Sequence, residues 1–391
     1  MVTKSRYVTP VYRGQGLGRR RRRNRRIIFI LIAVLIVLYF CFSAYSRKDD
    51  IKKTIQKTLS VESPKSFSAI QKRSGKFKFK WSPVEGAQGY TIYKYSTNSN
   101  KYIELRKFNG DTTEFTSRIQ KAKYAVKSYI KNGKKYITSK KYTVCRFKTI
   151  SDMIEIVGHR GALDQAPENT LASYKRAHEI GYQSFETDYF ETDSNDLIIC
   201  HDRDLSIFTN FKESIQNVTD SNRKDYPITK GINISRYTTQ YLPTFEEAVQ
   251  SASRHNMNIY LHTKNVDLTE TAMNRIESII KKYHMRNKAT VFTPQPKLFF
   301  KLKKHDIRVG FLNLPNNTSD IVKAIDFAGK NKADILIMHY TKYLKKEHVD
   351  TAHTYNLKFG CYDTSDLKAA FKMVDFNVDF MITNKDFISQ Y

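Results

Sequence analysis

The strongest constraint on the fold is an alternation of short apolar runs with amphipathic stretches over residues 152–391. The amphipathic stretches, such as 169–180, 244–256 and 268–284, have the spacing of helices that bury one face. Strand candidates lie between them at 154–158, 184–189, 197–201, 258–264, 289–293, 308–313, 335–339, 358–362 and 380–383. About eight parallel strands, most of them followed by a helix, predict a closed (β/α)8 barrel, or TIM barrel, with functional residues at the carboxyl ends of its strands.

Residues 63–148 have a different pattern, with short alternating runs that indicate the strands of a small all-β sandwich. The clearest runs are FKFKW, GYTIYKY, KYIELRKF, YAVKSYI and KKYTVCRF, at 77–81, 89–95, 101–108, 124–130 and 140–147. Turn residues separate them, including Asn132 and Gly133, a dipeptide typical of tight hairpins. Trp81 followed by Pro83, Gly86 and GYTIY at 89–93 resembles the fibronectin type III pattern, which implies seven strands with Trp81 in the core.

An uncharged run of 19 residues, IIFILIAVLIVLYFCFSAY, lies near the amino terminus at 27–45. A helix of this length rises roughly 28 Å, close to the ~30 Å hydrocarbon core of a bilayer, and its aromatic end disfavours a cleaved signal peptide. The run therefore predicts one transmembrane helix. By the positive-inside rule, the arginine run before it predicts a cytoplasmic tail at 1–26, a linker at 46–62, and a sandwich and barrel outside the cell. The predicted localisation is the cell membrane, with a single pass.

The net charge of +29 is concentrated in the first 150 residues. Residues 51–150 contain 24 Lys and Arg against 5 Asp and Glu, whereas residues 151–391 contain 31 of each kind. The charge balance of the C-terminal domain argues against an enzyme of nucleic acids, and no nucleic-acid partner is expected. The basic sandwich is either a spacer or a surface that binds anionic lipid or an anionic wall polymer. The four cysteines are widely spaced, which excludes a zinc ribbon and a disulfide scaffold.

Polar residues gather where the predicted barrel strands end. Glu186 and Asp188 lie two apart on one strand, so both carboxylates point to one face and favour a divalent cation between them, Mg²⁺ or Ca²⁺. His159 and His201 follow different strands and suit an acid–base pair near neutral pH. Two cations suited to a phosphate also follow strands, Arg160 and Lys264. Together these residues predict phosphodiester chemistry.

Five motifs follow one another through the predicted barrel: GHRG at 158–161, PENT at 167–170, ETD at 186–188, TDSNDLIICHD at 192–202 and LPTFEEAV at 242–249. In this order and at these spacings they resemble the glycerophosphodiester phosphodiesterases. The resemblance implies a divalent-metal TIM barrel that cleaves glycerophosphodiesters to glycerol 3-phosphate and an alcohol. It implies that His159 and His201 are acid and base and that Glu186 and Asp188 are metal ligands. It also implies substrate-site roles for Arg160, Glu168, Asn169 and Lys264.

The sequence departs from the family pattern at two positions. His262 stands where the family usually has a third acidic metal ligand, and we expect it to be the third ligand of the Mg²⁺ or Ca²⁺ site, although a neutral imidazole removes one negative charge and itself prefers softer ions. Near the last strands, the usual motif with Trp is replaced by GCYD at 360–363. Residues 203–241 fit the family's insertion over the barrel mouth, and we expect them to influence substrate choice.

The leading hypothesis is a membrane-anchored, extracellular, metal-dependent phosphodiesterase that acts on free, lipid-derived or teichoic-type glycerophosphodiesters. A second hypothesis is a catalytically degenerate barrel that binds phosphodiesters or an anionic wall polymer. A third is a lyase-type phospholipase of a related barrel family. Retention of both His159 and His201 favours catalysis over binding, whereas loss of the third acid favours the reverse.

Overall fold

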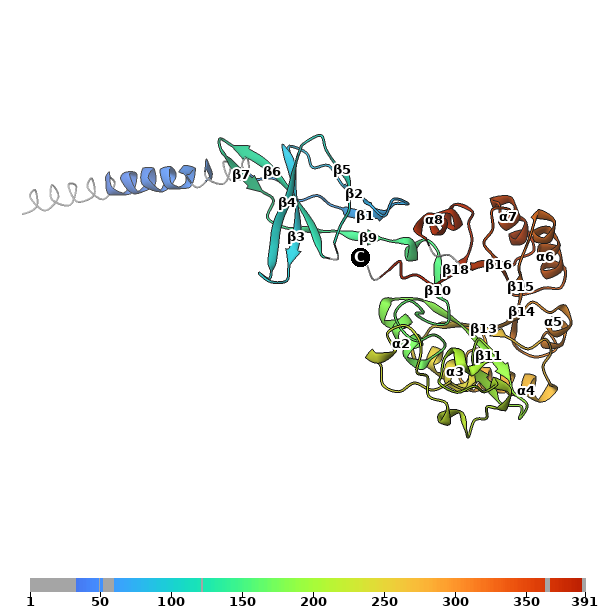
Figure 1. The fold of residues 1–391 in the computed structure, drawn as a ribbon. Helices are drawn as coiled ribbons and strands as arrows, with labels where there is room; N and C mark the ends of the chain where they lie inside the picture. Colours follow the sequence, from blue (N-terminus) through green and yellow to red (C-terminus); the bar gives the residue numbers. More distant parts are fainter. Residues whose placement is uncertain (1–32, 49, 52–59, 121, 363–365, 389–391) are drawn as a thin grey trace, which may run out of the picture.

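The computed structural model describes residues 33–48, 50–51, 60–120, 122–362 and 366–388. Figure 1 shows three parts in chain order: a helical segment, a domain made of β-strands and a larger domain in which strands alternate with helices.

The predicted cytoplasmic tail at 1–26 lies outside the described residues, and so does the first part of the predicted span at 27–45. Helix is described at 33–48, where the apolar run ends at Arg47 and Lys48. A bilayer span needs roughly 20 consecutive apolar residues. In the described part of the chain, no helix is both long enough and apolar enough to span a membrane. The prediction of a single-pass cell-membrane protein is therefore wrong.

Residues 67–148 form two β-sheets that share a core. The first sheet, in the order β5-β2-β1-β9, consists of β5 (Glu114–Ser117), β2 (Phe77–Trp81), β1 (Phe67–Gln71) and β9 (Arg146–Lys148). The second, in the order β4-β3-β6-β7 with β8 also paired to β6, consists of β4 (Lys101–Asn109), β3 (Gly89–Ser96), β6 (Tyr124–Asn132), β7 (Lys135–Thr138) and β8 (Thr143–Val144). Trp81 is 1 % exposed and packs between the sheets against Phe67 and Tyr90. In β1 and β2 every second residue is buried against this core, as the alternating sequence indicates.

The strand predicted at 140–147 is divided at Cys145. On one side β8 pairs antiparallel with β6, and on the other β9 pairs parallel with β1, so the chain crosses from one sheet to the other. Nine strand segments are described here instead of the seven that the resemblance implied. The likeness to a fibronectin type III module stays a prediction.

The C-terminal domain is a closed eight-stranded parallel barrel, as predicted. Its strands are β10 (Glu155–Gly158), β11 (Ser184–Glu191), β13 (Asn258–Thr263), β14 (Ala289–Thr293), β15 (Arg308–Asn313), β16 (Ile335–His339), β17 (Lys358–Tyr362) and β18 (Phe380–Thr383). Pairing of β10 with both β18 and β11 closes the barrel. The helices between the strands are α2 (Leu171–Ile180), α3 (Phe245–Arg254), α4 (Glu270–Lys282), α5 (Pro296–Leu302), α6 (Thr318–Lys330), α7 (Lys346–Thr354) and α8 (Leu367–Asp375). They form the outer layer of the barrel (Figure 1).

The run at 197–201, which the sequence places among the parallel strands, is not a barrel strand. Only Leu197–Ile199 forms a strand, β12, and it pairs antiparallel with the end of β11. A tight turn joins the two strands, and Asn195 in that turn has a φ of 61°. The third barrel strand is therefore β13. Because the hairpin folds back on β11, it returns the chain to the level of Asp188, where the backbone N–H of Cys200 donates to the Asp188 carbonyl.

The insertion at 203–241 has short 3-10 turns and a small core of its own. The turns are η2 (Leu205–Ile207), η3 (Ile215–Asn217), η4 (Arg223–Asp225) and η5 (Ile234–Arg236). Their apolar side chains pack on β11 and β12 through Phe190 and Ile198. At the far end, Asn233 Nδ2 and Tyr237 Oη donate hydrogen bonds to the carbonyl of Gln165, at 3.0 and 3.1 Å. The insertion therefore braces the loop between β10 and α2.

The two domains meet at the β1–β2 hairpin and the turn η1 (Ile150–Asp152). Gln71 Oε1 accepts a hydrogen bond of 3.0 Å from the backbone N–H of Ile150, which is fully buried. Arg73 in the hairpin forms an ion pair with Asp375 at the end of α8.

Candidate active site

A cavity of about 260 Å³ opens at the carboxyl ends of the barrel strands. It is lined by His159, Arg160, Glu186, Asp188, His201, His262, Lys264, Phe292, Pro294, Leu312, Leu314, Ile337, Tyr362 and Ile382. Seven of the nine residues predicted for the site are in this lining, and they come from the ends of β10, β11, β12 and β13. The other two, Glu168 and Asn169, lie behind it.

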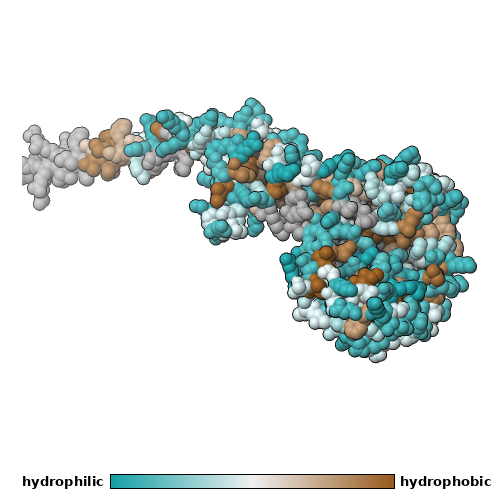
Figure 2. Space-filling view, in the orientation of Figure 1, coloured by the Kyte–Doolittle hydropathy of each residue, from teal (hydrophilic) through white to brown (hydrophobic). Residues whose placement is uncertain are grey.

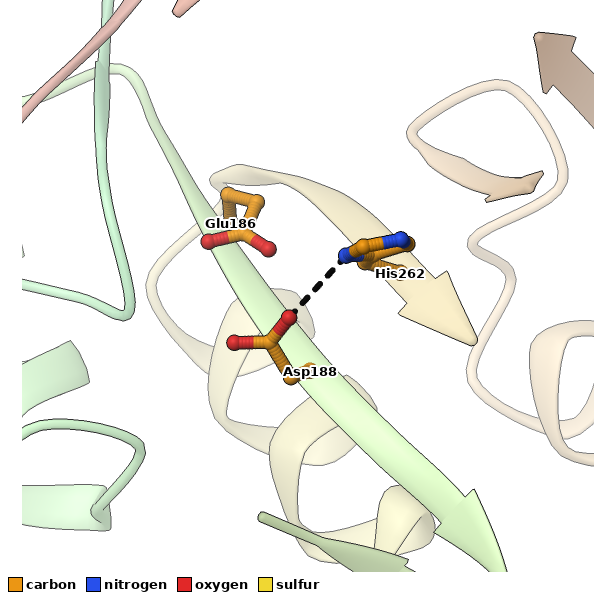
Figure 3. A group of neighbouring side chains, drawn as sticks. All are labelled: Glu186, Asp188 and His262. Atoms are coloured by element: carbon orange, nitrogen blue, oxygen red, sulfur yellow. Dashed lines mark hydrogen bonds and ion pairs between the residues drawn. The ribbon is translucent and has the colours of Figure 1, made fainter. Parts of the chain in front are cut away.

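Glu186, Asp188 and His262 form a compact group that can hold a metal ion. One potential ligand atom of each residue lies within 4.8 Å of the others. Figure 3 shows the two carboxylates on one strand and the imidazole on its neighbour, turned toward one another. Glu186 and Asp188 are 2 % and 1 % exposed. Two buried carboxylates and a ring nitrogen are a donor set that suits a divalent cation, so these residues fit the metal that the sequence predicts.

The two carboxylates differ in how readily they ionise. Burial and the neighbouring charge of Asp188 raise the pKa of Glu186 well above its usual range. Burial acts on Asp188 in the same direction, but the hydrogen bond from His262 and the charge of Lys264 lower the pKa of Asp188 below its usual range. Asp188 therefore holds a negative charge in the cavity, and a bound cation would favour the ionised form of Glu186 as well.

His262 is fixed by its neighbours on both sides. Its Nδ1 lies 3.0 Å from Asp188 Oδ1, and its ring stacks on Phe292 with the centroids 4.8 Å apart and the planes 7° from parallel. The stacking follows from register, since His262 and Phe292 are directly paired between β13 and β14. Burial lowers the pKa of His262. A neutral imidazole is therefore held edge-on toward the acidic pair.

The loop after β10 has a strained backbone that the site itself supports. Arg160 has a φ of 53°, and Gly161 follows at 87°. Such a conformation at a residue other than glycine is costly and is found where the surroundings hold it. Here the backbone N–H of Arg160 donates to Glu186 Oε2 at 3.1 Å, and its carbonyl accepts from Ser173 Oγ at 2.9 Å. The turn thereby aims the Arg160 side chain into the cavity.

Glu168 and Asn169 orient the residues that line the cavity. Glu168 Oε1 accepts a hydrogen bond of 2.7 Å from Arg160 Nη1, and Arg160 Nε lies 3.5 Å from Asp188 Oδ2. Asn169, 4 % exposed, donates to Asp188 Oδ2 at 3.3 Å and accepts from Thr187 Oγ1 at 2.8 Å. In this structure both residues contact protein groups behind the cavity lining.

His159 presents one ring nitrogen to the cavity. Its Nδ1 lies 2.5 Å from Asn384 Oδ1, and its Nε2 lies 3.8 Å from Glu186 Oε2. An amide oxygen can only accept, so Nδ1 bears the proton and Nε2 is the unprotonated nitrogen of the neutral ring. Asn384 directly follows the last barrel strand but is not among the residues predicted for the site.

His201 also has a partner at each ring nitrogen. Its Nδ1 lies 2.9 Å from Asp202 Oδ2, and its Nε2 lies 3.2 Å from Lys264 Nζ. Lys264 Nζ is also 3.7 Å from Asp188 Oδ1. The histidine is therefore oriented by a carboxylate on one nitrogen and faces a cation on the other. Asp202 ends the motif at 192–202, but nothing in that motif alone distinguishes a residue that orients His201.

The remaining wall of the cavity is apolar. It is formed by residues from β14 to β18 and the loops that follow them, including Phe292, Leu312, Leu314, Ile337 and Ile382. Leu314 is 56 % exposed at the rim, whereas Ile337 is fully buried at the floor. The cavity thus has one charged side and one apolar side.

Comparison with known proteins agrees with this geometry. The model of the "Glycerophosphoryl diester phosphodiesterase family" matches residues 159–386, more than half of the chain. The chain belongs to this family. All nine residues predicted for the site lie within the matched range.

Curated members of the family include proteins to which parts of the chain are similar. It is 26% identical over 160 residues to glycerophosphodiester phosphodiesterase 1 of Mus musculus, which covers 40% of this chain and 48% of the relative. It is 27% identical over 144 residues to a glycerophosphodiester phosphodiesterase of Bacillus subtilis, which covers 35% of this chain and 49% of the relative. The chain thus spans about half the length of these curated relatives.

Solved structures of the family have the same fold. A putative glycerophosphoryl diester phosphodiesterase from Silicibacter pomeroyi superposes with a TM-score of 0.52 at 14% identity, covering 61% of this chain and 91% of that one. A phosphodiesterase from Oleispira antarctica, solved in complex with the product sn-glycerol-3-phosphate, superposes with a TM-score of 0.50 at 19% identity, covering 62% and 97%. At these identities the likeness shows the barrel fold.

Proposed function

We propose that the chain is a metal-dependent phosphodiesterase that hydrolyses glycerophosphodiesters to glycerol 3-phosphate and an alcohol. The observation that supports this most is that two oriented histidines, two cations and an acidic group suited to a metal share one cavity of about 260 Å³. Family membership and the product bound to the Oleispira antarctica phosphodiesterase support the same reaction.

In this proposal the charged side of the cavity binds the phosphate. Arg160 offers a planar guanidinium and Lys264 a point charge, and both line the cavity. Glu186, Asp188 and His262 would hold a divalent cation, which when bound supplies positive charge to the phosphoryl oxygens. Glu168 and Asn169 keep Arg160 and Asp188 in place from behind.

The two histidines then divide the proton transfers. His159 Nε2, left unprotonated by the contact of Nδ1 with Asn384, accepts the proton of a glycerol hydroxyl as its oxygen bonds to phosphorus. The bond from phosphorus to the alcohol oxygen breaks, and that oxygen takes a proton from Nε2 of His201, which acts in its protonated form with Asp202 on Nδ1 and with Lys264 turned toward the phosphate. Water then opens the resulting cyclic phosphate. In this step His201 accepts a proton from the water, and His159 gives its proton to the glycerol oxygen that leaves phosphorus. The products are glycerol 3-phosphate and the free alcohol.

The apolar side of the cavity receives the alcohol in this proposal. Burial of an apolar group against Leu312, Leu314 and Ile337 would contribute roughly 25 cal/mol for each Å² removed from water. This wall therefore favours diesters whose alcohol has an apolar part, including lipid-derived ones.

The proposal also includes a binding role for the basic β-domain, toward anionic lipid or an anionic polymer. The excess of 24 basic over 5 acidic residues in 51–150 supports it. A mere spacer needs no such excess.

The test is an assay of the purified chain with glycerophosphocholine and with diesters of longer alcohols, with glycerol 3-phosphate as the measured product. The protein is first stripped with chelator and then supplied separately with Mg²⁺, Ca²⁺, Mn²⁺ or Zn²⁺. We expect turnover that chelator abolishes and at least one ion restores. A chain that binds the diester but releases no glycerol 3-phosphate with any ion would be a binding protein instead.

A further inference from the structure

The β-domain has an apolar cleft that its own core does not fill. Two adjoining hollows of about 770 and 510 Å³ lie along β4, and both are lined by Lys94 and Leu105. Their volumes fall within the range of small-molecule sites, roughly 300–1,000 Å³. In Figure 2, hydrophobic residues interrupt the otherwise hydrophilic surface of this domain.

The cleft arises because the two sheets differ in extent. β4 has nine residues and β5, the edge strand of the other sheet, has four. Near one end of β4, Phe108 packs in the shared core, but toward the other end Ile103 and Leu105 are 48 % and 53 % exposed. A register shift between Ile92 and Tyr93 on the paired strand β3 falls at the same level. Adjacent apolar side chains left in the open in this way often mark a binding surface.

The rest of the cleft continues this apolar surface inward. Phe115, Ile119 and Phe147 line its floor and are partly buried against the core. The floor is therefore fixed by the packing of the domain.

Cations surround this apolar floor. Lys94, Arg106, Arg118 and Lys123 line the two hollows. None of the four forms an ion pair within the described part of the chain. Glu104 is the acidic residue of the lining, and it pairs with Lys107 at 2.5 Å. The cleft thus combines an apolar surface with uncompensated positive charge.

We propose that this cleft binds a single-chain anionic amphiphile, with its alkyl or acyl chain on Ile103 and Leu105 and its phosphate group near Lys94 and Lys123. Charge complementarity favours the phosphate group of the ligand, and the exposed apolar side chains favour its alkyl or acyl chain. This goes beyond the reaction proposed for the barrel and does not require it. The cleft would be the site of the anionic lipid binding that we propose for the β-domain.

The chemistry of the cleft separates this ligand from others. A nucleic acid would use free aromatic faces for stacking, but the apolar surface here is mainly aliphatic at its exposed part. A neutral amphiphile would leave the four cations without an anionic partner, since Lys94 contacts the neutral Gln120, and Arg106 and Lys123 lie over the rings of Phe108 and Tyr95. A second copy of this chain would bring a similarly basic domain against the cleft, and like charges repel.

The experiment is calorimetric titration of the purified chain with dodecyl phosphate below its micelle concentration. We expect saturable binding that is weaker for octyl phosphate and for the uncharged dodecyl maltoside. Leu105→Ser should weaken binding by roughly tenfold, because burying a leucine side chain contributes on that order. Lys94→Gln combined with Lys123→Gln should weaken it several-fold and reduce its dependence on salt.

Val144→Ser is the matched control, because Val144 is 52 % exposed in the same domain but lies outside both hollows. If Val144→Ser and Leu105→Ser weaken dodecyl phosphate binding equally, or if no saturable binding is seen, the cleft is not the binding site. Concentration-dependent dimerisation that Leu105→Ser abolishes would assign the surface to a second copy instead. Glycerophosphocholine turnover by the wild-type chain is measured separately: binding without turnover contradicts only the proposed reaction, and turnover without binding contradicts only the cleft.

Discussion

The Nδ1 atom of His262 lies 3.0 Å from Oδ1 of Asp188, so an imidazole on β13 faces the two carboxylates of β11. Burial lowers the pKa of His262, which favours the neutral ring, and Nδ1 would bind a metal by giving up the proton that it donates to Asp188. Compared with three carboxylates, this donor set has one negative charge fewer. Its preference among divalent ions should shift accordingly.

Replacing His262 by Glu should strengthen binding of Mg²⁺ and Ca²⁺ and reduce the relative preference for Zn²⁺, because hard cations favour carboxylate oxygen. The measurements are metal affinity by titration and turnover with each ion. His339→Glu, which adds the same charge at the exposed end of β16, is the control. If the wild type is inactive with every ion and His262→Glu gains activity, the barrel is a decayed enzyme. An unchanged ion preference would show that His262 is not a ligand.

Replacing either histidine of the proposed acid–base pair should lower kcat by roughly 10²- to 10⁴-fold, the usual contribution of a positioned proton donor or acceptor. His159→Ala and His201→Ala are assayed with glycerophosphocholine, and circular dichroism checks that each variant is folded. Unaltered turnover in both variants would overturn this assignment.

Asn384 should act through His159, since its contact with Nδ1 sets which ring nitrogen is protonated. Asn384→Ala should lower kcat less than His159→Ala does, and Asn384→Asp, which keeps an acceptor oxygen, should recover part of the loss. A shifted pH profile in Asn384→Ala would support orientation of the ring. A loss of metal affinity without a change in that profile would contradict it.

The barrel and most of its site could be predicted because their signals are local. Strands such as Ala289–Thr293 and Ile335–His339 are largely apolar runs of the right length, and they are buried in the barrel wall except for His339. Glu186 and Asp188 share a face because alternate residues of a strand point the same way. The register that stacks His262 on Phe292 depends on pairing between β13 and β14, which no single strand reveals.

Other features could not be predicted correctly, because they depend on contacts between segments that are distant in the sequence or on pairing that a single segment does not reveal. The run at Leu197 looks like a barrel strand because it is apolar, but its short turn lets it pair back on β11. The sandwich strand predicted through Cys145 divides because its two halves join different sheets. The apolar run at 27–45 is long enough in sequence for a membrane span, yet no helix in the described part of the chain is both long enough and apolar enough to span a membrane. Asn384 reaches His159 across 225 positions of sequence.

Leu314 tests the apolar side of the cavity. It lines the rim and is 56 % exposed, so its replacement by Ala should not disturb the barrel core. We expect Leu314→Ala to lower kcat/KM for diesters of long-chain alcohols by about fivefold, the effect of roughly 1 kcal/mol of lost apolar contact. Glycerophosphocholine should be affected less, because its alcohol is polar. An equal loss for both substrates would argue that the alcohol does not lie on this wall.

Glu155 at the opposite end of the barrel should make stability depend on pH. Its Oε2 lies 2.6 Å from Lys358 Nζ, and its Oε1 accepts hydrogen bonds from Asn258 Nδ2 and Tyr260 Oη at 3.0 and 3.2 Å. Burial alone would raise the pKa of Glu155, but Lys358 and the hydrogen bonds from Ser184 and Asn258 lower it below 4.5. A carboxyl whose pKa is lower in the folded than in the unfolded state stabilises the fold above its unfolded pKa, and this contribution is lost as the pH falls through the folded value.

Glu155→Gln should therefore reduce the free energy of unfolding by about 2 kcal/mol at neutral pH, because it leaves the Lys358 charge without its partner. Urea unfolding curves measured from neutral pH downward should show the wild type and Glu155→Gln converging once the carboxyl is protonated. Glu347→Gln is the control: Glu347 is exposed and pairs with Lys345 at 3.2 Å, and such surface pairs contribute less than about 1 kcal/mol. A constant difference between wild type and Glu155→Gln at every pH would mean that the ionised carboxylate is not the stabilising group.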